Sequence, residues 1–140
     1  MNQGAGKGIV EIIGRDSFMW LSMEFNEETR LKDVPDDILE HVSSVDITLR
    51  DYAGDRNAIT SIALLTFAYK IGGKVQHPKY GSNDIILLKI MAKNERSRRN
   101  GKKLSNNQLW DAPLFELITG EVGERIRETK IMTNPMYIGF

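Results

Sequence analysis

The sequence predicts an α+β fold, a single domain in which a mixed or antiparallel sheet of about five strands packs on a buried central helix, with a second helix near the C-terminus. Several short segments alternate apolar and polar residues, which is the period of a strand with one wet face. One longer segment is apolar on most sides and precedes two glycines, as a core helix would. The 140 residues, 41% of them hydrophobic, match the usual size and composition of one domain.

The N-terminal part of the chain is predicted to form a flexible lead, residues 1–7, followed by a β-hairpin. Ile9–Ile13 is a short apolar run with the composition of a first strand. Gly14–Ser17 has the chemistry of a turn. In the predicted second strand, Phe18–Phe25, apolar side chains at alternate positions share one face: Met19, Leu21, Met23 and Phe25.

A short helix and a strand are predicted next. Pro35 suits the first turn of a helix, and Asp36 with Asp37 suits the positive end of the helix dipole, so we expect a helix that ends at Val42. Val45–Arg50 then alternates apolar and polar side chains. This pattern predicts a strand with one exposed face.

The segment Arg56–Ile71 is the predicted core helix. Its apolar residues cover more than one stripe of the helix surface, which indicates a helix covered on most sides. Asp55 can cap its first turn, and Gly72 with Gly73 provides a stop.

The second half of the chain is predicted to add two strands, a loop and a helix. Lys74–His77 is a brief strand, and Asp84–Ala92 is a long interior strand because both of its faces are apolar. Residues 93–105 are charged and non-periodic, which favours an exposed loop. A last helix is indicated by apolar positions between Phe115 and Ile126. We expect the apolar tail, residues 131–140, to fold back on the sheet, with docking on a neighbouring copy as the alternative.

The net charge of zero hides two blocks of opposite sign. Residues 33–55 hold seven acidic residues and one basic residue, for a net charge of −6. Residues 70–103 hold ten basic residues and two acidic ones, for a net charge of +8. Because local fields steer association more than the sum of charges does, we expect the molecule to be an electrical dipole.

Composition also suggests where the protein works. It has no cysteine, so it lacks disulfides and thiolate metal sites. Residues Met1–Gly8 do not have the apolar core of a signal peptide, and the most apolar run, Ile59–Leu65, is too short for a transmembrane segment. We therefore expect an intracellular, cytoplasmic and soluble protein.

Motifs for catalysis or metal binding are weak in this sequence. Gly4–Gly8 is rich in glycine, but a strand rather than a helix is predicted after it, which argues against a phosphate-binding loop. His41 and His77 are the two histidines, and neither has the spacing of a zinc or hydrolase motif. The carboxylates of Asp46 and the segment Asp51–Asp55 do not match a calcium loop. We expect no catalytic residue, no metal and no cofactor.

The best functional candidate is the segment Lys93–Lys103. Flexible lysine and arginine side chains bind phosphates by charge and by forked hydrogen bonds. Tyr80 and Trp110 flank the segment, and aromatic side chains beside basic ones can stack on unpaired bases, which favours single strands. The basic residues of the segment are Lys93, Arg96, Arg98, Arg99, Lys102 and Lys103.

Three functional hypotheses follow from these observations. The leading one is a non-catalytic interaction protein that binds nucleic acid, or an acidic protein partner, through the basic segment. The first alternative is a self-assembling structural or adaptor protein, a homo-oligomer in which the acidic block of one copy meets the basic block of the next. The second is an enzyme whose site joins residues distant in sequence, such as His77 and carboxylates.

Overall fold

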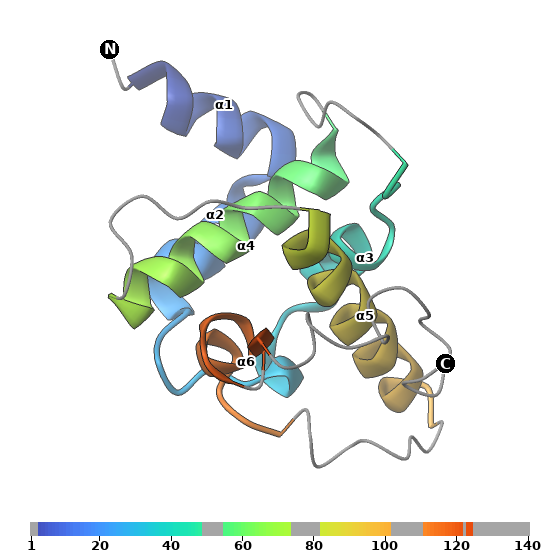
Figure 1. Cartoon of the computed structure of the whole chain (residues 1–140). Coiled ribbons are helices and arrows are strands. Elements are labelled where there is room, and N and C mark those ends of the chain that lie inside the picture. The colour runs from blue at the N-terminus through green and yellow to red at the C-terminus, as the bar shows by residue number, and fades with distance from the viewer. Residues whose placement is uncertain (1–2, 49–54, 74–81, 102–110, 122, 125–140) are drawn as a thin grey trace.

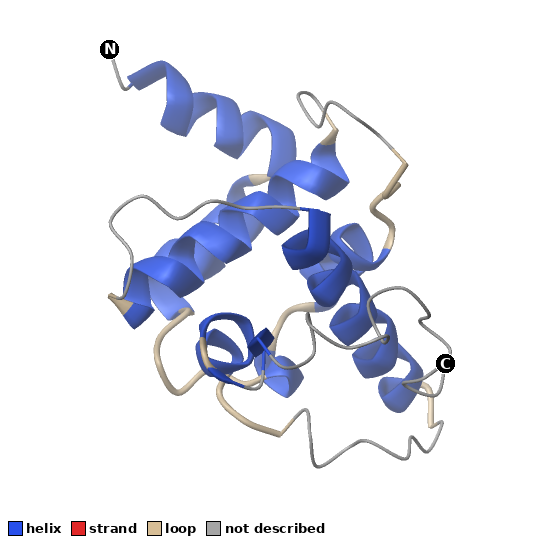
Figure 2. Cartoon of the chain, viewed as in Figure 1, coloured by secondary structure: helices blue, strands red, loops and turns tan. Residues whose placement is uncertain are grey.

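The computed structural model of this chain describes residues 3–48, 55–73, 82–101, 111–121 and 123–124, and within these residues the regular structure is helical (Figures 1 and 2). The described elements are six α-helices, one π-helix and one 3-10 helix. In the described part, β pairing is limited to one isolated antiparallel bridge between Arg30 and Pro113. The predicted α+β class is therefore wrong, and the described part of the chain has an all-α fold.

The N-terminal segment forms three consecutive helical elements in place of the predicted lead and hairpin. These are α1 (Gln3–Ile13), α2 (Arg15–Met19) and the π-helix η1 (Trp20–Glu24). Gly14, predicted to lie in a hairpin turn, separates α1 from α2 with a φ of 95°, a conformation that glycine adopts without strain.

Burial in this segment follows a helical period rather than the alternation of a strand. The buried positions recur every fourth residue, so they lie along one side of a helix: Ile13, Ser17, Leu21 and Phe25. Met19 and Met23 are 43% and 69% exposed, although a strand would have placed them on the buried face with Leu21. The two exposed methionines gave the sequence its misleading period of two.

In the next segment, residues 31–48, the predicted helix is present and the predicted strand is not. A short 3-10 helix, η2 (Leu31–Asp33), precedes α3 (Asp36–Ser43), which confirms the predicted helix after Pro35. Val45 is buried but Ile47 is 44% exposed, and Val45 and Asp46 have no regular structure before a turn at Ile47 and Thr48. The predicted strand over residues 45–50 is therefore wrong within its described part.

The central helix is confirmed as the sequence predicts it. The helix α4 spans Arg56–Gly72, and the Asp55 carboxylate accepts a hydrogen bond from the backbone N–H of Asn57 at 3.3 Å. Gly73 ends the helix in the left-handed conformation, with a φ of 61°. The side-chain cap and the terminal glycine satisfy backbone groups that a helix leaves unpaired at its ends.

The predicted long strand is part of a helix. The helix α5 runs over Ser82–Arg99, so both the predicted strand Asp84–Ala92 and the first seven residues of the predicted loop 93–105 are helical. An apolar segment that is buried on two sides gives the same sequence pattern in an interior strand and in a buried helix. The last helix, α6 (Leu114–Thr119), matches the start of the predicted one and ends before Gly120.

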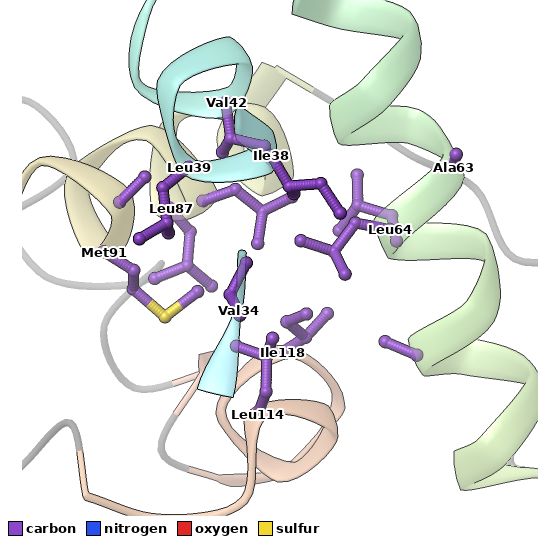
Figure 3. Close-up of a cluster of buried hydrophobic side chains, with 14 of the residues drawn as sticks. Val34, Ile38, Leu39, Val42, Ala63, Leu64, Leu87, Met91, Leu114 and Ile118 are labelled. Carbon is purple, nitrogen blue, oxygen red and sulfur yellow. The ribbon is translucent and has the colours of Figure 1, made fainter. Parts of the chain in front are cut away.

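The helices enclose one apolar core. In Figure 1, α3 lies beside α5 and α6 lies below α4, and Figure 3 shows α3 between α5 and α4. Buried side chains from all four helices and from Val34 meet in this space (Figure 3). The void left among ten of these residues is about 10 Å³, about the smallest space that admits one water molecule, so the core is closely packed.

Some predicted elements fall outside the described residues. These are the strand Lys74–His77, the end of the last helix and the apolar tail, residues 131–140. Among the helices that the structure describes, none has both the length and the apolar character that a membrane span requires.

A pair of substitutions separates the helical arrangement from the predicted hairpin. Leu21 is fully buried, so Leu21→Ala should lower the free energy of unfolding by about 2–5 kcal/mol. Met23→Ala should change it by less than about 0.5 kcal/mol, because that side chain is exposed on the other side of the helix. Urea denaturation of both variants measures the difference. Equal losses of stability would contradict the helical arrangement of η1.

Candidate functional site

The predicted basic loop is largely the C-terminal half of α5. Lys93–Arg99 is helical, and Asn100 with Gly101 forms a turn after it. The loop prediction is therefore wrong for these residues. Four predicted site residues lie outside the described part of the chain: Tyr80, Lys102, Lys103 and Trp110.

Two of the predicted phosphate-binding arginines are bound to a buried carboxylate. Glu95 is only 4% exposed, and it accepts hydrogen bonds from Arg98 Nε at 3.0 Å, Arg98 Nη2 at 2.6 Å and Arg99 Nε at 2.8 Å. The hydrogen bonds to Glu95 raise the pKa of Arg98 above its already high ordinary value. A buried carboxylate needs such partners, since an unpaired charge is costly to remove from water.

Arg99 also joins α5 to the segment before α3. Its Nη2 donates to the carbonyl oxygens of Val34 at 2.7 Å and Lys32 at 3.0 Å, and its Nη1 forms an ion pair with Asp36. The guanidinium thus satisfies acceptors on η2, on the turn after it and on α3. We call Glu95, Arg98, Arg99 and Asp36 the arginine clamp.

The remaining basic residues of α5 lie along one side of the helix. Lys89, Lys93 and Arg96 are spaced four and three residues apart, which places them in one row. We call this row the basic stripe. Lys93 and Arg96 are exposed, and Arg96 Nη1 donates to the Ser43 hydroxyl at 2.8 Å. Lys89 is half-buried, and its ammonium group donates to the carbonyl of Val45.

Electrostatics within the basic stripe disfavours one of its charges. Burial lowers the pKa of Lys89, and repulsion from Lys93 lowers it further, while Asp46 acts in the opposite direction. A bound anion would reverse the effect of the like charges. Burial is thus the main cause of the lowered pKa of Lys89, and Asp46 partly offsets the effect of Lys93.

The two charged blocks of the sequence meet within one molecule. The helix α3 comes from the acidic block and packs against α5 from the basic block. Arg99 pairs with Asp36, Arg96 contacts Ser43, and Lys89 lies at Val45 beside Asp46. The Arg99–Asp36 ion pair thus uses part of the opposite charge of the two blocks inside the fold.

The described residues do not form a catalytic arrangement around a histidine. His41 Nδ1 lies 3.2 Å from Thr60 Oγ1, but Thr60 is fully buried and its hydroxyl donates to the carbonyl of Arg56. Ser17 donates to Asp37 at 2.8 Å, with the serine itself buried. A nucleophilic serine or threonine needs an adjacent base and access to a substrate, and neither of these pairs provides both. His77 lies outside the described residues.

The other sequence candidates have local structural roles where they are described. Asp46 Oδ1 accepts hydrogen bonds from the Thr48 backbone N–H at 3.0 Å and the Thr48 hydroxyl at 2.6 Å, and these bonds lower the pKa of Asp46. Asp55 caps α4, and the glycine-rich segment Gly4–Gly8 is part of α1. In the part of the chain that the structure describes, no three metal-ligating side chains are grouped closely enough to hold an ion.

Sequence reasoning missed a groove beside η1. The groove has a volume of about 360 Å³ and is lined by Trp20, Glu24, Asn26, Glu28, Thr29 and Asp33. Its residues come from η1, η2 and the turn between them. The apolar Met23 beside Glu24 carried the available signal, but the strand prediction assigned it to the buried face.

Searches against known protein families, curated proteins and solved structures found no significant match to this chain.

The arginine clamp predicts that the two kinds of arginine on α5 differ in their effect on stability. Arg99→Met should lower the free energy of unfolding by about 2–4 kcal/mol, because it leaves the buried Glu95 with one partner and deprives backbone carbonyls of theirs. Arg96→Met should change it by less than about 1 kcal/mol, since that side chain is exposed. Urea denaturation measures both. A similar small effect for both variants would show that the clamp does not hold the fold.

Proposed function

We propose that this protein is a non-catalytic interaction protein that binds a polyanion, single-stranded nucleic acid in preference to duplex, through the basic stripe on α5. The observation that carries the proposal is the row of three cations, two of them exposed, on one side of a well-packed helix. Lysine and arginine neutralise phosphates and fix the register of a nucleic acid strand without reading its sequence.

The shape of the stripe supports a single strand. The distance along α5 from Lys89 to Arg96 is seven residues, or about 10 Å of helix. The stripe is one residue wide, because buried side chains cover the flanking sides of α5: Ile85 and Ala92 on one side, and Ile90 on the other. A single row of this length matches a few consecutive phosphates of one strand. Two backbones separated by a groove about 12 Å wide would need a second basic row.

The clamp explains which charges are available for binding. Arg99 is engaged with Glu95, Asp36 and backbone carbonyls, so it serves the fold. Arg98 is shared between Glu95 and solvent, with 43% of its side chain exposed. Lys102 and Lys103 follow in the chain and would add to the same anionic contact if it extends past α5.

Binding should depend on salt in proportion to the number of phosphate contacts. For the three cations of the stripe, the logarithm of the affinity for a labelled oligothymidylate should fall with the logarithm of salt concentration with a slope of about −2. Participation of Arg98, Lys102 and Lys103 would steepen the slope to about −4. Fluorescence anisotropy at several salt concentrations measures it. Absence of salt-dependent binding at low ionic strength would remove the proposal.

A matched pair of charge reversals tests whether the stripe is the site. The double variant Lys93→Glu/Arg96→Glu should abolish oligonucleotide binding, while Arg15→Glu/Lys70→Glu should retain most of it. Both variants change the net charge equally, and all four side chains are exposed, but Arg15 and Lys70 lie on α2 and α4. Equal losses in the two variants would show that total charge, rather than the stripe, determines binding.

The titration of Lys89 provides a second, independent measurement. Its lowered pKa means that the folded protein disfavours the charged form, so this cost is full below the folded-state pKa, falls as the pH rises past it, and is gone above the unfolded-state pKa. A bound phosphate chain should raise the pKa of Lys89 toward its ordinary value. Side-chain NMR with and without saturating oligothymidylate detects the change. An unchanged pKa at saturation would place the binding site elsewhere.

A further inference from the structure

The helix formed by α2 and η1 leaves an apolar row uncovered. Met19 and Met23 lie four residues apart and are 43% and 69% exposed. Trp20 and Glu24 form the neighbouring row, and both line the groove beside η1. Methionine is flexible and polarizable, and exposed methionines are typical of surfaces that accept another protein's apolar side chains. We call Met19 and Met23 the methionine row.

The groove next to the methionine row is acidic. Glu24, Glu28 and Asp33 contribute three exposed carboxylates to its lining, and no basic residue is among the described residues that line it. Within the described residues, neither Glu24 nor Glu28 forms an ion pair with a residue of the chain. Trp20 packs edge-on against Phe25, with ring centroids 5.7 Å apart and an interplanar angle of 78°. The groove thus combines negative charge with an indole held in place.

The turn that forms the floor of the groove is fixed by its own hydrogen bonds. Asn26 Oδ1 accepts from the backbone N–H of Glu28 at 2.7 Å, and Thr29 Oγ1 accepts from the backbone N–H of Asn26 at 2.9 Å. The carbonyl of Thr29 accepts from the backbone N–H of Leu114 at 2.7 Å, which ties the turn to α6. A preformed surface of this kind loses little conformational entropy when a partner binds.

We propose that the methionine row and the acidic groove together dock a basic amphipathic helix of a partner protein. Lysine or arginine side chains of that helix enter the groove, where carboxylates and the Trp20 indole attract a cation. Apolar side chains on the adjacent face of the helix cover Met19 and Met23. The charge of the groove selects a cationic partner, and the methionine row requires that the partner also present an apolar face.

A second copy of this chain fits the surface less well. Outside the arginine clamp, the basic stripe of α5 is the densest group of cations among the described residues. The apolar sides of α5 are buried in the core. The stripe therefore offers charge without the apolar face that the methionine row needs. The occupant of this surface is therefore a separate protein, and the experiment below also detects self-association.

The test uses the intrinsic fluorescence of Trp20. The chain has two tryptophans, so the variant Trp110→Phe leaves Trp20 as the only reporter. The probe is a helical peptide of leucine and lysine with the two residue types on opposite faces. We expect a saturable change in Trp20 emission with this peptide. Isothermal titration calorimetry of the unmodified protein with the same peptide measures the affinity independently. It therefore replaces the fluorescence titration if Trp110→Phe disturbs the fold.

Matched peptides and variants identify what the surface recognises. A leucine–glutamate peptide should not bind, and a serine–lysine peptide should bind at least about tenfold more weakly because it cannot cover the methionine row. Glu24→Gln/Glu28→Gln should weaken binding of the leucine–lysine peptide by about tenfold. The control Glu27→Gln/Glu40→Gln removes two exposed carboxylates that do not line the groove, and it should leave the affinity within about twofold.

Several results would overturn this proposal. The first is binding of the leucine–glutamate peptide as tight as that of the leucine–lysine peptide. The second is an equal loss of affinity in the two double glutamine variants. The third is no binding of the leucine–lysine peptide by calorimetry. Sedimentation that shows a dimer of the unmodified protein, lost in Trp20→Ala, would assign the surface to a second copy instead. The Glu24→Gln/Glu28→Gln variant should keep its affinity for oligothymidylate, so this docking surface and the basic stripe fail or succeed independently.

Discussion

A buried carboxylate on α5 sets the position of the neighbouring elements. Removing a carboxylate from water is costly without partners, and Arg98 and Arg99, one turn further along the helix, provide them for Glu95. Arg99 then has donors left over, which bind the carbonyls of Lys32 and Val34. Because those carbonyls flank the start of α3, the clamp holds α3 against α5. The core that α3 and α5 share with α4 and α6 depends on this arrangement.

The fold and the proposed binding site use different cations of the same helix. Arg99 binds several acceptors within the fold, while Lys93 and Arg96 are exposed and Arg96 makes one hydrogen bond to Ser43. A segment with a net positive charge therefore contains both structural and surface charges, and the sequence alone does not separate them. Once α5 is known to be a helix, the helical period separates the two groups of charges, because Lys89, Lys93 and Arg96 then form one row. Of this row, Lys93 and Arg96 belong to the predicted basic site, whereas Lys89 was not predicted to be part of it.

The sequence predicted the helices that carry terminal signals and missed the ones that lack them. Helix α4 has an aspartate cap and a terminal glycine, and α3 has a proline before two acids, so local chemistry marks both. In α5, Asn94 and Glu95 are 1% and 4% exposed, which contradicts the assumption that a polar run is an exposed loop. The groove could not be predicted either. Its residues come together only when η1 and η2 are helical and the turn between them folds back.

The 3-10 helix η2 connects the two candidate surfaces. Asp33 lines the acidic groove, and the Asp33 carboxylate accepts from the backbone N–H of Arg30 at 2.9 Å, which fixes the start of η2. The preceding residue, Lys32, offers its carbonyl to Arg99. A short element with few internal hydrogen bonds takes its position from such outside contacts. The wall of the groove is therefore held in place by an arginine of the helix that carries the basic stripe. An anion that drew Arg99 away from Lys32 would loosen η2, whereas one that bound only Lys93 and Arg96 would leave the groove unchanged.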